Sequence, residues 1–472
     1  MAQLAAGTDL LLVPSYSADP RTLASIDGLD SWPERHLIEL RHLLNPSNRL
    51  VLLSPTPMSE ACLDAVLKLI PAVPAAWLRE RLHCLCLNDR SPLPLTHKLL
   101  ARPRLLEQLQ TQLRPGALLG CYAVSSAEMA LAELLGLKLE GTPASLAELG
   151  SKAGAAQVFA QLGLPHPRTT PLCRSLMQLA DACEALLLSH GDIEQLVVKL
   201  NRMAGGRGNA PLLLAHGQWH LQPARERRQQ LQHALNQLAM PLPHWREELQ
   251  RNGAIAQELI SAPAGALSSP SVQLWLHHDG EVELISTHEQ CLGGPHRQSF
   301  KGCIFPARQA YSRELMAMGE KLGRHLAGLG CRGPVLLDLL ARREQGSWRI
   351  WAIEINLRKG GTTHPFQLAA TGTGGRFERS SGQLRSSTGA EVFYEASDEL
   401  RQPHWRGLLP DQLLDEMVQR NLYFNSANHY GCIPHRLGAL SEHGLLGVTA
   451  VGRSRREAAG LMQQMRWVGL PH

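Results

Sequence analysis

The spacing of apolar residues along the chain predicts alternating strands and helices up to about residue 145. Short continuous apolar runs, typical of strands buried on both faces, alternate with stretches whose apolar positions repeat at helical spacing. The predicted strands are Asp9–Val13, Arg49–Ser54, His83–Leu87 and Leu118–Ala123, and the predicted helices include Glu60–Leu69 and Ala127–Leu137. This alternation predicts an open α/β layer with a mostly parallel sheet. No G-x-G-x-x-G follows these strands, so a dinucleotide site is not predicted there.

The pattern changes after a linker-like GTPAS at 141–145 and again beyond about residue 375, where serine and charged residues become frequent. The elements predicted after the linker are helices at 152–162, 175–190 and 311–328, strands at 196–200 and 254–260, and a hairpin over 271–287 that turns at Asp279-Gly280. A strand at 445–452 and a helix from Ser454 are predicted near the C-terminus. We therefore expect three domains, over residues 1–145, 146–375 and 376–472.

Composition favours a globular enzyme over a disordered chain, since 44% of the 472 residues are hydrophobic and 19% are charged. The net charge of +5 is small and the basic residues are scattered, so nucleic acid is not the expected partner. Ten cysteines occur without a C-x-x-C pair, which indicates reduced structural thiols. No signal peptide or membrane-spanning run is recognisable, so we expect a cytoplasmic protein without a membrane partner. The sequence leaves the oligomeric state open.

The string WAIEINLRKGGTTHPF at 351–366 carries the most informative polar pattern. Its Glu354, Asn356 and Arg358 occupy alternate positions, separated by apolar residues. If this segment is a strand, the three side chains share one face and present a carboxylate, an amide oxygen and a guanidinium in a row. Mg²⁺ takes oxygen ligands and often shares them with nucleotide phosphates, while arginine offers a forked donor to a carboxylate or phosphate.

A second apolar strand, Val335–Leu340, contains a single acid, Asp338, whose burial without a partner would be costly. A three-residue loop at Gln345–Ser347 would set Asp338 directly opposite Glu354, about 5 Å away on the same face. A cation between the two carboxylates would relieve their repulsion. A four-residue loop would turn Asp338 to the other face unless a bulge corrected the register. The alternative is a surface hairpin whose acids meet arginines, which suits Glu354 better than Asp338.

A glycine-rich loop, Met203–Asn209, lies between two predicted strands and follows Lys199. Glycine hairpins can lay backbone N–H groups over phosphates, and the ammonium of Lys199 could reach the same phosphates. Taken alone, the loop is more simply a bare turn. Lys152, at the start of its predicted helix, would on its own be a surface lysine.

Two further polar segments have an ordinary and a functional interpretation. Gln257 and Glu258 interrupt an apolar strand, which indicates either an adenine hinge or the solvent face of an edge strand. The segment 287–302 combines His288, Gln290 and Lys301 with several glycines. It is typical of a substrate-facing loop or of a long surface loop.

The order of these parts resembles the ATP-grasp superfamily: a helix lysine, a strand lysine, a glycine hairpin, a Gln-Glu pair and then Asp…Glu-x-Asn-x-Arg. The strings VVKLN, SPSVQL, STHEQCLGGP, EINLRKGGTTHPF and LGALSEHGLLGVTAVG are similar to its peptide-ligase branch, typified by the ligase of pheganomycin assembly. The resemblance covers nearly the whole chain. It implies an ATP-grasp fold of the α/β and α+β classes, in which two α+β subdomains sandwich ATP. A Rossmann-like domain over 1–145 would precede this fold, and a small C-terminal domain over 376–472 would follow it.

The resemblance also implies an activity and a division of roles. A carboxylate–amine ligase of this kind uses ATP and Mg²⁺ or Mn²⁺ to phosphorylate a small-molecule or peptide carboxylate, and an amine then attacks the acyl phosphate. By position, the implied roles are phosphate binding by Lys152 and Lys199, cover of the γ-phosphate by Gly205, Gly206 and Gly208, adenine or ribose contact by Gln257 and Glu258, metal binding by Asp338, Glu354 and Asn356, and catalysis by Arg358 and Lys199. Substrate contacts are expected from His288, Gln290, Lys301, Thr363 and His364.

The glycine-rich loop Met203–Asn209, called the lid, departs from the resemblance at one position, because Arg207 stands where a smaller or acidic residue is expected. Two other functions remain open on the sequence. The first is a kinase-like phosphotransferase acting on a hydroxyl group, and the second is a non-catalytic nucleotide-binding module.

Overall fold

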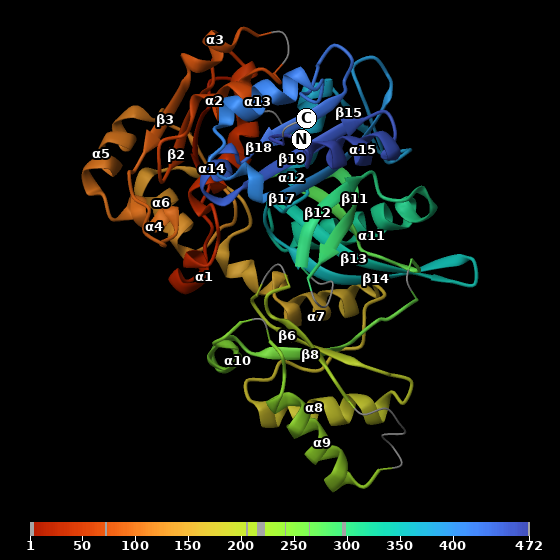
Figure 1. Cartoon of the computed structure of the whole chain (residues 1–472). Helices are drawn as coiled ribbons and strands as arrows, with labels where there is room; N and C mark the ends of the chain where they lie inside the picture. Colours follow the sequence, from red (N-terminus) through yellow and green to blue (C-terminus); the bar gives the residue numbers. More distant parts are fainter. Residues whose placement is uncertain are drawn as a thin grey trace.

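The computed structural model describes residues 4–70, 73–203, 206–214, 222–240, 242–263, 265–294 and 299–470. Figure 1 shows a leading α/β layer in red and orange, a small yellow-green domain below it, and a large sheet that runs from green to blue. Among the described residues, no helix combines the length and the apolar character needed to cross a bilayer.

The leading layer has the predicted parallel sheet, in the order β3-β2-β1-β4-β5. Its strands are β1 (Asp9–Val13), β2 (Arg49–Ser54), β3 (Leu82–Cys86), β4 (Leu118–Cys121) and β5 (Lys138–Glu140). Its helices are α1 (Pro20–Ala24), η1 (Leu29–Leu44), α2 (Glu60–Leu67), α3 (Ala75–Arg79), α4 (Leu95–Leu100), α5 (Pro103–Gln112) and α6 (Ser126–Leu135). The strand order reverses between β1 and β4, and open α/β sheets bind ligands beyond the carboxyl ends of the strands at such a point.

The small domain is built on a three-stranded antiparallel sheet in the order β7-β6-β8. Its elements are α8 (Leu176–Ser189), β6 (Leu196–Leu200), β7 (Asn209–Leu212), α9 (Ala224–Asn236), α10 (Trp245–Asn252) and β8 (Ala254–Glu258), and η2 (Ala144–Gly150) and α7 (Lys152–Leu162) lead into it. The side chain of Ser151 caps α7 by accepting from the N–H of Gly154, so Lys152 is the first helical residue, as predicted. The glycine-rich loop connects β6 to β7, as predicted.

The large sheet has eleven strands and contains both acidic strands. Its strands are β9 (Leu267–Ser268), β10 (Pro270–Leu276), β11 (Val282–Gly293), β12 (Ser299–Phe305), β13 (Gly333–Glu344), β14 (Ser347–Asn356), β15 (Arg376–Glu378), β16 (Gln383–Arg385), β17 (Glu391–Arg401), β18 (Gly431–His435) and β19 (Leu445–Gly452). The associated helices are α11 (Gln309–Gly328), α12 (Thr363–Thr373), η4 (Pro403–Trp405), α13 (Pro410–Gln419), η5 (Leu437–Ala439), α14 (Leu440–His443) and α15 (Arg455–Met465). The segment 287–302, expected to be a loop, consists mainly of β11 and β12, because its backbone groups pair as an antiparallel ladder.

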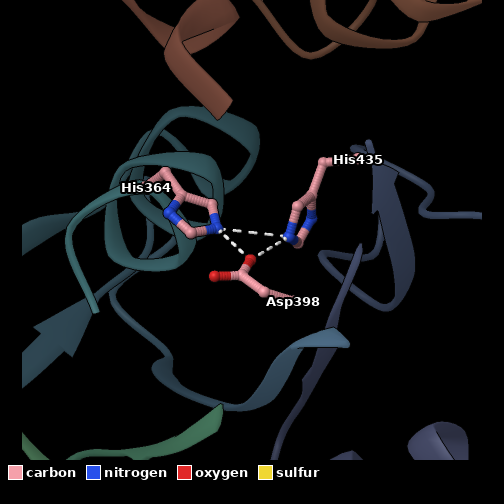
Figure 2. A group of neighbouring side chains, drawn as sticks. All are labelled: His364, Asp398 and His435. Atoms are coloured by element: carbon pink, nitrogen blue, oxygen red, sulfur yellow. Dashed lines mark hydrogen bonds and ion pairs between the residues drawn. The ribbon is translucent and has the colours of Figure 1, made fainter. Parts of the chain in front are cut away.

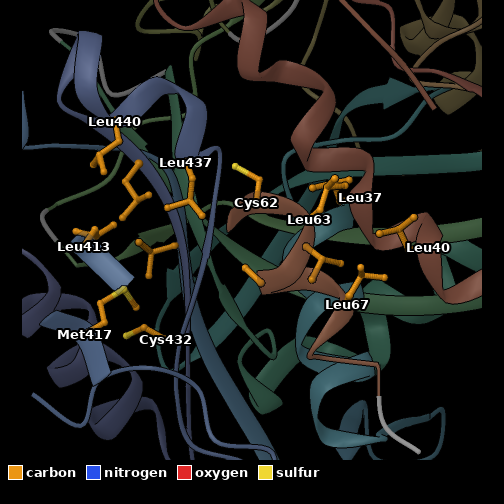
Figure 3. Packing of buried hydrophobic residues seen from close by; sticks show 14 of the residues in the cluster. Leu37, Leu40, Cys62, Leu63, Leu67, Leu413, Met417, Cys432, Leu437 and Leu440 are labelled. Carbon is orange, nitrogen blue, oxygen red and sulfur yellow. The ribbon is translucent and has the colours of Figure 1, made fainter. Parts of the chain in front are cut away.

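The expected boundary near residue 376 interrupts neither the sheet nor the core. β12 pairs with β17 across that boundary, with Cys303 opposite Ala396. Leucines of β1 and β2 pack in one apolar cluster with residues of α13, β19 and α15. Figure 3 shows this cluster, with Leu37 and Leu63 on one side and Leu413 and Leu440 on the other. The first and last parts of the chain therefore share a core.

The acidic hairpin reaches the predicted register by an unexpected route. Gln345 and Gly346 form a two-residue turn in which both residues have positive φ, and Glu344 pairs with Ser347. Such a turn alone would have placed Asp338 opposite the wrong neighbour, on the wrong face. A β-bulge at Ile353 corrects the register, so that Asp338 lies opposite Glu354. The predicted pairing is confirmed, whereas the predicted three-residue loop is wrong.

Candidate active site

A cavity of about 1100 Å³ lies between the leading layer, the small domain and the large sheet. Tyr16 and Tyr122 of the leading layer form part of its wall, and Lys199 of the small domain forms another part. Asp338 and Glu354 of the large sheet complete the polar side. Residues from all three parts of the chain therefore face one space.

The side chains of Asp338, Asn356 and Arg358, called the polar row, form a hydrogen-bonded network in this wall of the cavity. Asn356 donates from Nδ2 to Oδ2 of Asp338 at 3.0 Å, and Arg358 donates from Nη2 to Oδ1 of Asn356 at 2.7 Å. Gln290, on the neighbouring strand β11, donates from Nε2 to Oδ1 of Asp338 at 2.5 Å. The structure thus brings together four residues that the sequence singled out in three separate segments.

The two opposed carboxylates have different electrostatic surroundings. Burial, followed by the charge of Glu354, raises the pKa of Asp338 to about 7. Burial also pushes the pKa of Glu354 upward, but Lys152, together with Arg358 and Lys199, outweighs it and the net shift is downward. Nζ of Lys152 lies 2.6 Å from Oε2 of Glu354. Between the two acids, both of which the structure describes, only Glu354 has an ion-pair partner.

The side-chain oxygens of Asp338, Glu354 and Asn356 suit a hard divalent cation. Two carboxylates and an amide oxygen are the ligand types that Mg²⁺ prefers, and a cation between Asp338 and Glu354 would remove the repulsion that holds the Asp338 pKa high. Asp338, Glu354 and Asn356 are therefore the residues that could hold Mg²⁺.

Lys199 enters the cavity from β6 as a buried ammonium. Its Nζ donates to Oε1 of Gln257 on β8 at 2.6 Å, while Gln257 donates from Nε2 to Thr169 at 3.0 Å. Burial and then the nearby charge of Lys152 lower the pKa of Lys199 to about 8. An anionic ligand such as a phosphate would stabilise the charged form of this lysine and raise its pKa again.

The glycines of the lid have distinct structural roles. Gly206 lines the cavity at a positive φ of 76°, a conformation that favours glycine. Gly208 faces Met203, whose Cβ would lie 2.6 Å from a Cβ added at 208, so Gly208 is required for hairpin packing. Gly205 lies outside the described residues. Arg207 lines the cavity beside Gly206.

Glu258 also lines the cavity, but its carboxylate already has a partner. Nε and Nη2 of Arg168 donate to its two oxygens at 2.8 Å each, and Arg168 also pairs with Asp192. Hydrogen bonds from Arg168 lower the pKa of Glu258. In this structure, Glu258 would meet a nucleotide as part of a salt bridge.

Two of the predicted substrate residues reach the cavity. Gln290 and Lys301 line it, and Lys301 pairs with Glu399 at 2.9 Å. Glu399 lies on β17, so the C-terminal part of the chain helps to place this lysine.

The other three predicted substrate residues lie in the core. His288 is completely buried against Phe305 and Phe366, and its Nε2 lies 2.5 Å from the hydroxyl of Tyr394. Thr363 donates to Oε1 of the buried Gln273 at 2.9 Å. His364 is buried beside Asp398. The strand and helix that carry these three side chains turn them into the core rather than into the large cavity.

Sequence reasoning missed the contribution of the leading layer. The hydroxyl of Tyr122 accepts from Nη1 of Arg358 at 2.8 Å, and Lys359 pairs with the buried Glu39 of η1 at 2.7 Å. Tyr16 and Tyr122 follow the carboxyl ends of β1 and β4, the point at which the strand order reverses. That general rule of parallel sheets was the available signal.

No protein-family model matches the chain. The L-propargylglycine–L-glutamate ligase of Streptantibioticus cattleyicolor is 28% identical over 470 residues, which span 96% of this chain and 92% of that protein. The IQ motif-containing protein H of Danio rerio is 23% identical over 262 residues, or 49% of this chain and 24% of that protein.

Solved ATP-grasp structures share the fold over nearly the whole chain. The ADP complex of N5-carboxyaminoimidazole ribonucleotide synthetase is 13% identical, with 98% of this chain and 97% of that chain covered and a TM-score of 0.55. The biotin carboxylase domain of Hydrogenobacter thermophilus 2-oxoglutarate carboxylase, solved with MgADP and bicarbonate, is 11% identical, with 97% and 89% covered and a TM-score of 0.55. The chain therefore has the ATP-grasp fold. The predicted resemblance to ATP-grasp ligases is confirmed.

Proposed function

We propose that this chain is an ATP-dependent carboxylate–amine ligase that forms an amide bond through an acyl phosphate. The observation that carries the proposal is the facing, half-buried pair of Asp338 and Glu354, connected through Asn356 to Arg358 in the wall of a cavity that Lys199 also enters. The similarity to a ligase over 96% of the chain supports the same conclusion.

The reaction has two steps. A carboxylate oxygen of the first substrate attacks the γ-phosphorus of ATP, the bond to the β,γ-bridging oxygen breaks, and ADP leaves. The amine nitrogen of the second substrate then attacks the acyl carbon, phosphate leaves and the amine loses a proton. Catalysis of both steps depends mainly on positioning and on charge neutralisation.

The residues of this chain divide that work. Lys199 and the lid around Gly206 would bind the phosphates. Asp338, Glu354 and Asn356 would hold Mg²⁺, which when bound neutralises phosphate charge. Arg358, fixed between Asn356 and Tyr122, would stabilise the developing charge of the acyl phosphate. The walls of the cavity would shield this intermediate from water.

We infer that both substrates are amino acids or short peptides. The relative is named for two amino acids, L-propargylglycine and L-glutamate. Gln290, beside Asp338, and Lys301, which pairs with Glu399, both lie on the cavity wall and could contact them. The cavity volume exceeds that of a typical small-ligand site, consistent with room for a nucleotide and a second molecule.

The test is to incubate the purified protein with ATP, Mg²⁺ and hydroxylamine, together with amino acids singly and in pairs. A ligase is expected to release ADP and to give a hydroxamate with the carboxylate substrate. A phosphorylated alcohol without hydroxamate would contradict the ligase and indicate a phosphotransferase. The control is the double variant Glu354→Gln and Asn356→Ala, which should lose ADP release. Retained turnover in that variant would contradict the metal assignment.

A further inference from the structure

A second group of metal-type side chains lies apart from the acidic pair. His364 of α12, Asp398 of β17 and His435 of β18 are all buried, and Figure 2 shows them pointing toward one another. Nε2 of His364 and Nε2 of His435 lie 2.7 Å and 2.8 Å from the same oxygen, Oδ1 of Asp398. The two Nε2 atoms are 3.1 Å apart. Three potential ligand atoms therefore converge from three separate elements.

The backbone is shaped locally to bring these side chains together. A register shift in the pairing of β17 with β19 sets both Asp398 and Glu399 opposite a single residue, Gly447. His435 also lies opposite Gly447, and a Cβ added there would lie 2.1 Å from the imidazole ring. The next residue, Arg436, has the left-handed φ of 56°, which non-glycine residues rarely adopt. Bulges and strained residues of this kind cluster at functional sites.

Hydrogen bonds alone explain this arrangement poorly. If both Nε2 atoms carry protons, two N–H groups crowd toward one oxygen and toward each other. If one nitrogen lacks its proton, its lone pair faces the carboxylate oxygen at close range. A cation placed between the three atoms would accept all three lone pairs at once.

Burial of the cluster, more than the charges around it, favours the neutral imidazole, the form in which histidine binds metals. Burial, then Arg35, lowers the pKa of both His364 and His435. Arg35 pairs with the other oxygen of Asp398, Oδ2, and Arg436 donates to the backbone oxygen of Asp398. These contacts orient the carboxylate and leave Oδ1 directed at the histidines, as outer partners of metal ligands commonly do.

We propose that His364, Asp398 and His435 bind a divalent transition-metal ion of the zinc class. Two imidazole nitrogens and one carboxylate oxygen form a ligand set typical of Zn²⁺, whereas Mg²⁺ prefers oxygen ligands. The ion would connect α12 to β17 and β18, and so the ATP-grasp part to the C-terminal part. Because Asp398 and Arg35 line the large cavity, the ion would lie behind its wall. This role replaces the substrate contact expected of His364.

The test is metal binding by the whole purified chain, stripped with a chelator and then titrated with Zn²⁺ or Co²⁺. We expect one tightly bound Zn²⁺ per chain by elemental analysis after gel filtration. With Co²⁺ we expect visible bands of low-symmetry coordination and no near-ultraviolet thiolate-to-metal band, which excludes the exposed Cys84 as the site. Absence of a tightly bound ion in the folded wild-type chain would overturn the proposal, as would a thiolate band. This measurement needs no variant.

Variants then locate the ion. His435→Gln and His364→Gln should each weaken Zn²⁺ binding at least about tenfold. The matched control is His277→Gln, which removes a histidine that lies 3.1 Å from the carboxylate of Glu283 and should leave Zn²⁺ binding unchanged. Glu354→Gln should also leave it unchanged, because that residue belongs to the Mg²⁺ site. Binding that survives both His435→Gln and His364→Gln would place the ion elsewhere and overturn the proposal.

Discussion

Two carboxylates of this molecule, the half-buried Asp338 and the buried Asp398, have opposite surroundings. Asp338 faces a second carboxylate, Glu354, and burial together with that charge raises its pKa. Asp398 instead faces two imidazoles and a guanidinium, that of Arg35. The first arrangement is unfavourable until a cation arrives, whereas the second already contains its own counter-charge. The comparison teaches that the two carboxylates differ in their ion pairing: Asp338 has no ion-pair partner among the described residues, while Asp398 has the guanidinium of Arg35.

The largest loss of activity is expected from the substitution Asp338→Asn. Removing one metal-type ligand should lower the rate of ADP release by about 10³-fold, the scale on which single electrostatic groups act in catalysis. Stability should change by less than about 1 kcal/mol, because the change removes repulsion and Gln290 can rotate its amide to accept. The measurements are ADP release and urea unfolding. A large loss of stability would mean that Asp338 is a structural acid.

The corresponding substitution in the second cluster, Asp398→Asn, should mainly lower stability, whereas Asp338→Asn mainly lowers activity. It leaves the buried guanidinium of Arg35 without its carboxylate, and breaking a buried pair in this way costs about 3–5 kcal/mol. Unfolding in urea, followed by circular dichroism, measures the loss. An unchanged midpoint would show that Arg35 finds another partner.

The pH dependence of nucleotide affinity tests Lys199. Its pKa is lowered to about 8, so the free protein loses this charge as the pH rises through 8. Phosphate binding needs the ammonium, so the Kd for ATP should rise, by about fivefold between pH 8 and pH 9. Below pH 7 the ammonium is charged, so its contribution to the Kd for ATP no longer changes with pH. Lys199→Arg keeps its charge throughout and should remove the dependence. If the Kd for ATP rose equally with pH in both proteins, Lys199 would be excluded as the titrating group.

A smaller effect is expected where the leading layer meets the polar row. Tyr122→Phe removes the hydroxyl that accepts from Arg358 but keeps the ring. We expect kcat to fall by about tenfold, with the KM for ATP unchanged, because a hydrogen bond to a charged group contributes about 1.5 kcal/mol at the lower end of its range. Arg358→Lys should lower kcat further. A change in the KM alone would mean that Tyr122 contacts the nucleotide.

The smallest effect is expected at the lid. Arg207 lines the cavity but belongs to a surface loop, where an added charge contact contributes about 1 kcal/mol or less. Arg207→Ala should therefore raise the KM for ATP by about two- to fivefold. An unchanged KM would show that this guanidinium points away from the phosphates.

The same comparison explains how much of the molecule the sequence could predict. Asp338 and Glu354 lie on one hairpin, so alternation and a short turn were enough to pair them, even though the turn was two residues long and a bulge at Ile353 supplied the correction. The parallel direction of the strands in the leading sheet also followed from local patterns. Both predictions depend on neighbours in the chain.

The second cluster could not be predicted in this way. His364, Asp398 and His435 are spread over more than seventy residues, and a bulge in β17 and the missing side chain at Gly447 decide whether they meet. For the same reason, the inward orientation of His288 depends on packing against Phe366 of α12. Such placements arise from long-range packing, for which a single sequence carries no local signal.

The shared core has a consequence for how the protein is made. The apolar cluster that contains the leucines of β1 and β2 is complete only when α13, β19 and α15 have been synthesised. During translation, the part of the cluster that these late elements cover stays open to water and to other nascent chains for most of the elongation time. A premature stop codon near residue 380 would therefore yield an aggregating fragment rather than a smaller working enzyme.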